Sequence, residues 1–328
     1  MIYRIETTWD NANIQALGIS KEIESINPGN DDVVGFDFSH YREANPFSNL
    51  VLINSILNYK TAHPDIHIRI RQKDNDTYLP HIGFYKALKV PIGKELSEAI
   101  ANPNYVPVTT IPFSAYFYDE IVKRSDELAK TIQFDHSFQE FLGYLFQETI
   151  RNAFEHADTD NALVAAQNWP SKNTLEVAIA DSGCGIASTL RSHFAKDDLG
   201  LLEYALRPGI TAGSNFGYKD VHDPWRNTGY GLYMIRQAAL ACNGSFIICS
   251  DGNALRYYRD KNGYPAKSVY ETRYKGTAIG IRFRTDISLD FEALISRIRM
   301  EGELLAAQTD GAIRSASKSS SGRFQLKL

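Results

Sequence analysis

The stretch between residues 138 and 186 constrains this chain more than any other. Apolar side chains recur there at the three-to-four spacing of one buried helix face: Phe138, Phe141, Leu142, Leu145, Phe146, Ile150, Ala153 and Ala157. A polar break at 170–173 follows, and the next segment alternates like a strand at Leu175, Val177 and Ile179. The strand ends at Asp181, in a turn interrupted by glycines. A long helix and a strand end therefore each offer polar groups to a site.

Each of these polar residues has a chemical use. Glu148 and Asn152 lie four apart, so they project from neighbouring turns along one edge of the helix. The carboxylate could orient an attacking water or hydroxyl, and the amide oxygen could help to hold a magnesium ion. Asp181 could accept a hydrogen bond from the amino group of an adenine. Gly183 and Gly185 would let the main chain approach that ring.

The two strings 148–157 and 181–186 resemble the GHKL superfamily of ATPases and kinases. Two later strings follow in the order of that superfamily. Residues 227–232 (Asn-Thr-Gly-Tyr-Gly-Leu) look like its glycine motif over the phosphates, and residues 275–277 (Lys-Gly-Thr) look like its last motif. The resemblance covers roughly residues 138–285. It implies an α/β fold class (α+β), with a Bergerat α/β sandwich that holds ATP and magnesium between a sheet and helices.

The resemblance implies a role for each matching position. Glu148 would be the general base, Asn152 the magnesium ligand, and Asp181 with Thr277 the adenine contacts. The complete set expected to bind ATP is Asn152, His156, Asp181, Gly183, Gly185, Ile186, Thr228, Gly229, Gly231, Leu232 and Thr277.

The segment from Ile186 to Gly229 is predicted to be a mobile lid over the nucleotide, because glycines alternate there with polar residues in a long irregular loop. The basic residues that could face phosphates are Lys196, Arg207, Lys219 and Arg226. The simpler interpretation is that each of these side chains is a solvated surface charge of the lid. The segment from Gly231 to Cys242 is predicted to be a helix whose N-terminus would favour a phosphate.

The motif details favour some activities over others. Glu148 four before Asn152 is similar to the hydrolases and the anti-sigma serine kinases, and 152–157 is similar to the latter. Glu155 stands where many sensor kinases carry a lysine. The leading hypothesis is a magnesium-dependent ATP-binding regulator with ATPase or protein serine/threonine kinase activity. A nucleotide-gated interaction or dimerisation module without turnover, and a sensor histidine kinase lacking its stalk, remain alternatives.

Residues 1–100 are predicted to be a small separate α/β unit. Strands are expected at 33–38 and 66–70, a helix at 49–59 between them, and another helix at 79–88. This order predicts a parallel βαβ crossover and resembles a STAS domain. Where STAS antagonists carry a phosphorylatable serine, the chain reads Asn45-Pro-Phe-Ser48, so docking of a protein partner or dimerisation fits better than phosphorylation. His40 follows a strand directly, which favours a turn histidine over a phospho-acceptor.

The remaining chain is expected to comprise a linker and helix at 101–136, the ATP-binding domain at 137–308 and a flexible tail at 309–328. The composition, 43% hydrophobic and 23% charged, is that of a globular protein. A net charge of −4 gives no indication of nucleic-acid binding. No apolar run is long enough to span a membrane, and the three cysteines lack metal-ligand spacing, so the cytoplasm is the expected compartment.

Overall fold

The computed structural model describes residues 1–7, 11–42, 44–72, 77–89, 103–113, 117–132, 134–212 and 228–316, without the side chains of Phe117, Tyr118 and His156. Two sheets organise these residues, one parallel with three strands and one antiparallel with seven. The fold is therefore α+β, as the sequence predicts. Within the described ranges, no helix is long and apolar enough to cross a membrane.

The parallel sheet belongs to the N-terminal part of the chain. Its elements are β1 (Ile2–Thr7), α1 (Ala12–Ile23), β2 (Val33–Tyr41), α2 (Pro46–Ala62) and β3 (His67–Arg71), and the strand order is β1-β2-β3. The predicted parallel crossover is confirmed, although β1 and α1 were not predicted. The helix expected at 49–59 begins earlier because Asn45 and Ser48 form a reciprocal capping box and Pro46 fits the first turn.

One helix predicted in this part is wrong. Instead of a continuous helix over 79–88, the chain forms α3 (Tyr78–His81) and α4 (Phe84–Ala87). Gly83 separates them with a left-handed φ of 78°, a conformation that ends a helix.

The larger sheet has the order β4-β5-β6-β10-β7-β8-β9, and every neighbouring pair is antiparallel. The strands are β4 (Tyr105–Pro112), β5 (Asn161–Trp169), β6 (Thr174–Ala180), β7 (Ser245–Ser250), β8 (Asn253–Arg259), β9 (Pro265–Glu271) and β10 (Thr277–Arg284). The strand predicted at 175–179 is confirmed as β6. Alternating apolar residues also predict strands at 245–250, 255–259 and 277–284, and these are confirmed within two residues as β7, β8 and β10. β5 and β9 were not predicted.

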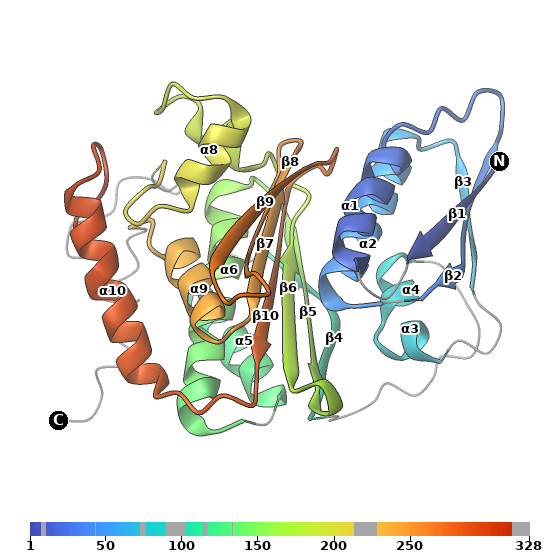
Figure 1. The fold of residues 1–328 in the computed structure, drawn as a ribbon. Helices are drawn as coiled ribbons and strands as arrows, with labels where there is room; N and C mark the ends of the chain where they lie inside the picture. The colour runs from blue at the N-terminus through green and yellow to red at the C-terminus, as the bar shows by residue number, and fades with distance from the viewer. Residues whose placement is uncertain are drawn as a thin grey trace.

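Helices cover one face of this sheet. They are α5 (Phe117–Thr131), α6 (His136–His156) and α9 (Gly231–Ala241), with α10 (Phe291–Ala307) packed outside them (Figure 1). Asp135 caps α6, because its side chain accepts from the Phe138 N–H. A 3-10 turn, η1 (Pro170–Lys172), joins β5 to β6.

The segment after Ile186 is more regular than predicted. It contains α7 (Ile186–Leu190) and α8 (Asp198–Ala205), which pack through a small apolar cluster that includes Leu190, Leu201 and Ile210. The expectation of an irregular loop throughout is therefore wrong for the described residues up to 212. Asp197 supplies the missing start signal, since its side chain caps α8 at the Gly200 N–H.

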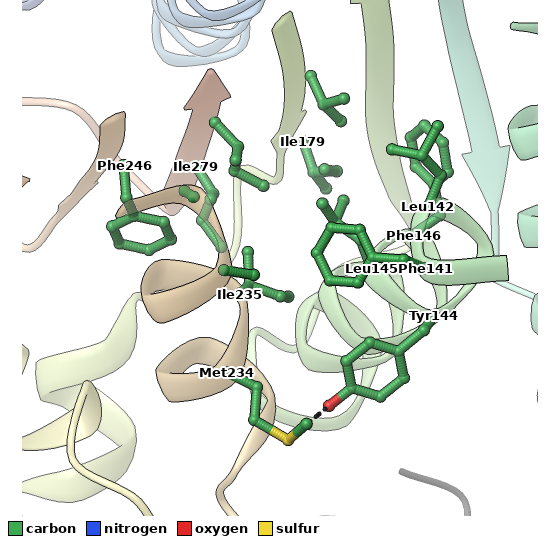
Figure 2. Packing of buried hydrophobic residues seen from close by; sticks show 14 of the residues in the cluster. Phe141, Leu142, Tyr144, Leu145, Phe146, Ile179, Met234, Ile235, Phe246 and Ile279 are labelled. Atoms are coloured by element: carbon green, nitrogen blue, oxygen red, sulfur yellow. Dashed lines mark hydrogen bonds between the residues drawn. The ribbon is translucent and has the colours of Figure 1, made fainter. Parts of the chain in front are cut away.

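The main core lies between the sheet and its helices. Figure 2 shows Phe141, Leu145 and Phe146 of α6 meeting Ile179 of β6 and Ile279 of β10, with Ile235 of α9 beside them. The Tyr144 hydroxyl contacts the Met234 sulfur at 3.3 Å. The apolar face predicted for 138–157 is therefore the face that holds α6 against the sheet.

The opposite face of the sheet is covered by the N-terminal unit. α2 packs on β5, β6 and β10, and the parallel sheet lies beyond α1 and α2 (Figure 1). A side chain at Gly280 would clash with Phe47 at 2.7 Å, so this glycine lets α2 lie close to the sheet. One apolar cluster runs through both parts, from Leu50 and Ile53 of α2 to Ala178 and Ile247 of the sheet. The strands β5, β6 and β10 of the larger sheet are thus covered on both faces.

Candidate functional site: a cavity between the sheet and its helices

A cavity of about 80 Å³ lies on the helix-covered face of the sheet. Its walls come from α6, from the strand ends of β6 and β10, from the α7–α8 segment and from the start of α9. Most lining groups are apolar, with few polar side chains, which is usual for small-molecule sites. The described lining residues that the sequence singled out are Asn152, Asp181, Gly185, Ile186, Gly229, Gly231, Leu232 and Thr277.

Asp181 is the most strongly held polar group in this cavity. It is 5% exposed, and its Oδ1 accepts from the N–H groups of Gly183 at 2.9 Å and Thr277 at 3.1 Å. Within the described part of the chain, no protein donor reaches its other oxygen, Oδ2. Asp181 therefore presents one anchored oxygen to the protein and one oxygen to the cavity.

Burial raises the pKa of Asp181 to about 7. The two N–H donors act in the opposite direction, and the nearby charge of Asp251 raises the pKa further. Since the folded-state pKa lies above the ordinary carboxyl value of 3.8, folding stability from this group is greatest at low pH. That contribution is lost as the pH rises through about 7.

A hydroxyl and a carboxylate behind Asp181 hold the glycine turn in place. Ser250 lies 3.1 Å from the Thr277 hydroxyl and accepts from the Ile186 N–H at 2.9 Å. Asp251 accepts from the Ala187 N–H at 2.6 Å, at the start of α7. A side chain at Gly185, where φ is 81°, would lie 2.5 Å from the Asp251 carboxylate. The turn therefore needs glycine at this position.

The end of α6 meets the Asp181 turn directly. The Cys184 N–H donates to the Ala157 carbonyl at 2.7 Å, and a Cβ at Gly183 would lie 2.0 Å from that carbonyl oxygen. Gly183 does not line the cavity, so its role in the structure is close packing between helix and turn. This contact brings together the two sequence strings that begin at Glu148 and Asp181.

Glu148 lies deeper than the cavity wall. It is 1% exposed, it is not among the described lining residues, and its Oε2 accepts from the Arg151 guanidinium at 2.8 Å. Arg151 also lies 3.8 Å from Glu155, so one buried cation faces two buried carboxylates. A Cβ at Gly231 would lie 2.7 Å from the Glu148 Oε2, and glycine there lets α9 begin against this pair.

Asn152 lies one turn beyond Glu148, half-buried, with its side chain on the cavity wall. No cluster of three or more acidic, histidine or cysteine side chains suited to a metal occurs in the described ranges. A single amide oxygen still fits magnesium, which keeps several waters and binds few protein groups when a phosphate supplies the others. The side chain of His156 lies outside the described residues, although its backbone ends α6.

The start of α9 closes one end of the cavity. Gly231 and Leu232 line it, and the N-cap residue Tyr230 makes no side-chain bond to the first turn. Gly229 has a left-handed φ of 70°, and a side chain there would lie 2.2 Å from the Ile210 carbonyl oxygen. Among the described residues, no capping side chain occupies the first N–H groups of α9, so they can bind an anion in the cavity. Thr228 is buried but does not line the cavity.

The predicted lid cations are arranged differently from the phosphate contacts expected of them. The Lys196 ammonium and the Arg207 guanidinium both lie over the Tyr204 ring, at 5.0 and 5.3 Å. Neither is among the described lining residues. The predictions for Lys219 and Arg226 fall outside the described residues. Lys275 pairs with Glu24 of the N-terminal unit at 3.2 Å.

Sequence reasoning missed several residues of the cavity wall and of the turn behind Asp181. Thr149 could have been found, because it lies on the same helix edge as Asn152, three positions earlier. Ser250 and Asp251 carried no local signal, because only the pairing of β7 with β10 brings them to Asp181. The apolar lid contacts Leu190, Ile210 and Ala212 depend on the packing of α7 and α8.

The N-terminal unit also reaches the site. The Asn54 amide of α2 donates to the Tyr274 hydroxyl at 2.7 Å, and that hydroxyl donates to the Asp181 carbonyl at 2.9 Å. All three residues are buried. A continuous chain of hydrogen bonds therefore joins α2 to the strand end that carries Asp181.

Comparisons with known proteins give little support for a family. No family model matches this chain, and no curated protein matches it. Among solved structures, the ATPase region of Saccharomyces cerevisiae topoisomerase II is 14% identical, with 50% of this chain and 44% of that chain covered and a TM-score of 0.25. The same region bound to ICRF-187 (dexrazoxane) is 14% identical, with 57% and 50% covered and a TM-score of 0.23. This chain spans about half the length of those structures, and TM-scores this low assign neither family nor activity.

Proposed function

We propose that this chain binds ATP in the cavity between the sheet and α6. The observation that carries the proposal is the outward-facing oxygen of Asp181, a buried acceptor beside apolar walls. Adenine is a flat apolar ring with an exocyclic amino donor, and Ile179 and Ile279 offer a surface for the ring. We also propose that the larger sheet and its helices form a Bergerat-type α/β sandwich. The order of the four sequence motifs supports this proposal.

The phosphates would lie toward the start of α9 and the side chain of Asn152. The N-terminal N–H groups of α9 favour negative charge there, and the cavity reaches Gly229 and Gly231. Magnesium would be held by the Asn152 amide oxygen together with phosphate oxygens and waters, and it would neutralise charge on the triphosphate. The α7–α8 segment contributes the opposite wall through Leu190 and Ile210.

Turnover would require Glu148 as the base that orients the attacking group. In this arrangement the Glu148 carboxylate binds Arg151, so a catalytic step needs that pair to open or to accept a water between them. The attacked group would be water in an ATPase or a serine or threonine hydroxyl in a protein kinase.

The same pair favours a second candidate function, a nucleotide-gated module without turnover. A carboxylate that is 1% exposed and bonded to a guanidinium is held away from a substrate in the cavity. ATP would then act through its different affinity for an open and a closed lid. The N-terminal unit would transmit the change in lid conformation to a protein partner. That partner could be a second copy of this chain, in a homodimer.

Calorimetric titration with ATP and magnesium tests the binding, and γ-labelled ATP tests the turnover. Saturable binding by the wild type that Asp181→Asn weakens about 100-fold supports the proposed site. The absence of binding, or binding that Asp181→Asn leaves unchanged, overturns it. Phosphate release that Glu148→Gln abolishes without loss of binding supports a base role for Glu148. Binding with no phosphate released and no label on added partner protein selects the gated module.

A further inference from the structure

A second cavity, of about 600 Å³, lies on the opposite face of the seven-stranded sheet, between that face and the N-terminal unit. Its lining includes four cationic side chains and one carboxylate among the described residues: Arg42, Lys172, Arg256, Arg282 and Glu176. Its volume is in the range of small-molecule sites, about 300–1,000 Å³. The charge of its walls separates it from the mostly apolar cavity that Asp181 faces.

The register of the sheet explains why charge gathers there. Residues paired across antiparallel strands share a face, so Gln167, Glu176, Arg282, Ser245 and Tyr258 form one row from β5 to β8. Along the same face toward Asp181, the positions become apolar, at Ala178, Ala180, Ala278 and Cys249, under α2. The polar row begins where the cover of α2 ends. The alternation of side chains along the strands therefore explains why the wall of this cavity is charged.

Two of the cations are available to a ligand. Arg282 is committed to Glu176 by a two-bonded ion pair, and Trp169 donates to the same carboxylate at 3.0 Å. In contrast, neither Arg42 nor Arg256 forms an ion pair with a carboxylate in the described ranges, and Arg256 lies over the Tyr258 ring at 5.0 Å. Guanidinium groups that keep their donors suit phosphate, which they bind in a fork.

The opposite wall adds asparagine side chains and helix N-termini, which also favour a negatively charged ligand. The cavity lies at the carboxyl ends of the parallel strands β1 and β2, where Asn11, Ala12 and Asn13 begin α1 and Asn45 caps α2. Ligands of parallel α/β sheets bind at the carboxyl ends of the strands, near the N-termini of the following helices. Asn11 makes no side-chain cap bond in α1. Helix ends and guanidinium groups thus converge on one space from two sheets.

We propose that this cavity binds a small molecule through a phosphate or pyrophosphate group held by Arg42 and Arg256. The proposal does not depend on ATP binding at Asp181, because Ile179 and Thr277 point to one face of the sheet and Glu176 and Arg282 point to the other. A ligand here would touch both the N-terminal unit and the sheet. It would therefore stabilise their packing.

Trp169 gives a direct test, because it lines the cavity next to Lys172. In the full chain with Trp9→Phe and Trp225→Phe, Trp169 is the remaining tryptophan of three. Pyrophosphate is titrated at constant ionic strength while the emission of Trp169 is followed. We expect a saturable change whose midpoint rises about tenfold in Arg256→Gln and in Arg42→Gln, as for a lost charged hydrogen bond.

Two variants serve as controls. Arg69→Gln removes an exposed cation on β3 outside the cavity and is expected to leave the midpoint unchanged. Asp181→Asn alters the other cavity and is also expected to leave it unchanged. The proposal is overturned if the emission does not saturate, if Arg256→Gln and Arg42→Gln bind as the parent does, or if Asp181→Asn removes the response.

Discussion

The two cavities lie on opposite faces of the same strands and have opposite characters. On the helix-covered face, Ile179 and Ile279 lead to a single carboxylate, Asp181, which is 5% exposed. On the face toward the N-terminal unit, Glu176 and Arg282 stand in a polar row that remains partly open to solvent. Since successive side chains of a strand alternate between faces, β6 and β10 serve both cavities with interleaved residues. On these two faces burial, rather than the number of charges, decides how strongly a charge contributes to stability.

The largest expected effect concerns a buried charge on the helix-covered face. Arg151→Leu leaves Glu148 and Glu155 without their shared cation, and both carboxylates are at most 1% exposed. We expect the free energy of unfolding to fall by about 3–5 kcal/mol, measured by urea denaturation. Arg256→Leu, which removes a half-buried cation on the other face, is expected to change it by less than about 1 kcal/mol. Equal losses of unfolding free energy in Arg151→Leu and Arg256→Leu would contradict the greater importance of the buried charge.

The second-largest effect is expected for ATP binding by Asp181→Asn, which replaces one carboxylate oxygen by an amide nitrogen. Asp181→Asn can still accept from the Gly183 and Thr277 N–H groups, but its amide N–H₂ then faces the cavity. A donor would meet the amino donor of adenine, so ATP affinity should fall about 100-fold, as for a lost hydrogen bond to a charged group. Calorimetry measures the affinity, and a melting curve checks that the fold persists. Undiminished affinity would place the adenine elsewhere.

The contact between α6 and the Asp181 turn can be tested sterically. Gly183→Ala puts a Cβ 2.0 Å from the Ala157 carbonyl oxygen, so we expect a loss of about 1–3 kcal/mol of stability in urea. Gly18→Ala is the matched control in α1, where nothing lies within 4 Å of the added Cβ. There the free energy of unfolding should rise by about 0.5–1 kcal/mol, because alanine is the better helix former. A neutral Gly183→Ala would disprove the close packing.

The smallest expected effect is a pH dependence that only the buried carboxylate should produce. The pKa of Asp181 is about 7, and in the proposed complex the ionised form would accept the hydrogen bond of adenine. Affinity should therefore rise about tenfold per pH unit below 7 and level off above it. Adenosine is the suitable probe, since it has no phosphate that titrates in this range. Because Asp251 contributes to the raised pKa of Asp181, Asp251→Asn should move the midpoint to lower pH. A flat profile from pH 5.5 to 8.5 would contradict an ionised Asp181 as the adenine contact.

Much of the site could be found from the sequence because its residues occur in local patterns. The spacing from Phe138 to Ala157 predicted α6 and its buried face, and the alternation at 175–179 predicted β6. Both patterns follow from chain geometry alone, since helices repeat every 3.6 residues and strands every two. Asp181 and Thr277 come together as expected, joined by a hydrogen bond between adjacent strands.

Other features had no local signal. The spacing of Glu148 from Asn152 led to its prediction as a base, but whether its carboxylate faces the cavity or Arg151 depends on how α9 packs at Gly231. The helices α7 and α8 were missed because Leu190, Leu201 and Ile210 form their apolar cluster only after the segment folds back on itself.

The sequence by itself determined the long helix, the alternating strands and the polar groups at their ends, because each depends on residues that are neighbours along the chain. The tertiary structure alone decided which carboxylate is exposed to a ligand, which is paired, and where the cations gather. Arg42, Arg256 and Arg282 are separated by up to 240 positions, and only the packing of one sheet against another brings them around one cavity. Burial and long-range pairing are properties of the folded chain, so no local pattern reports them.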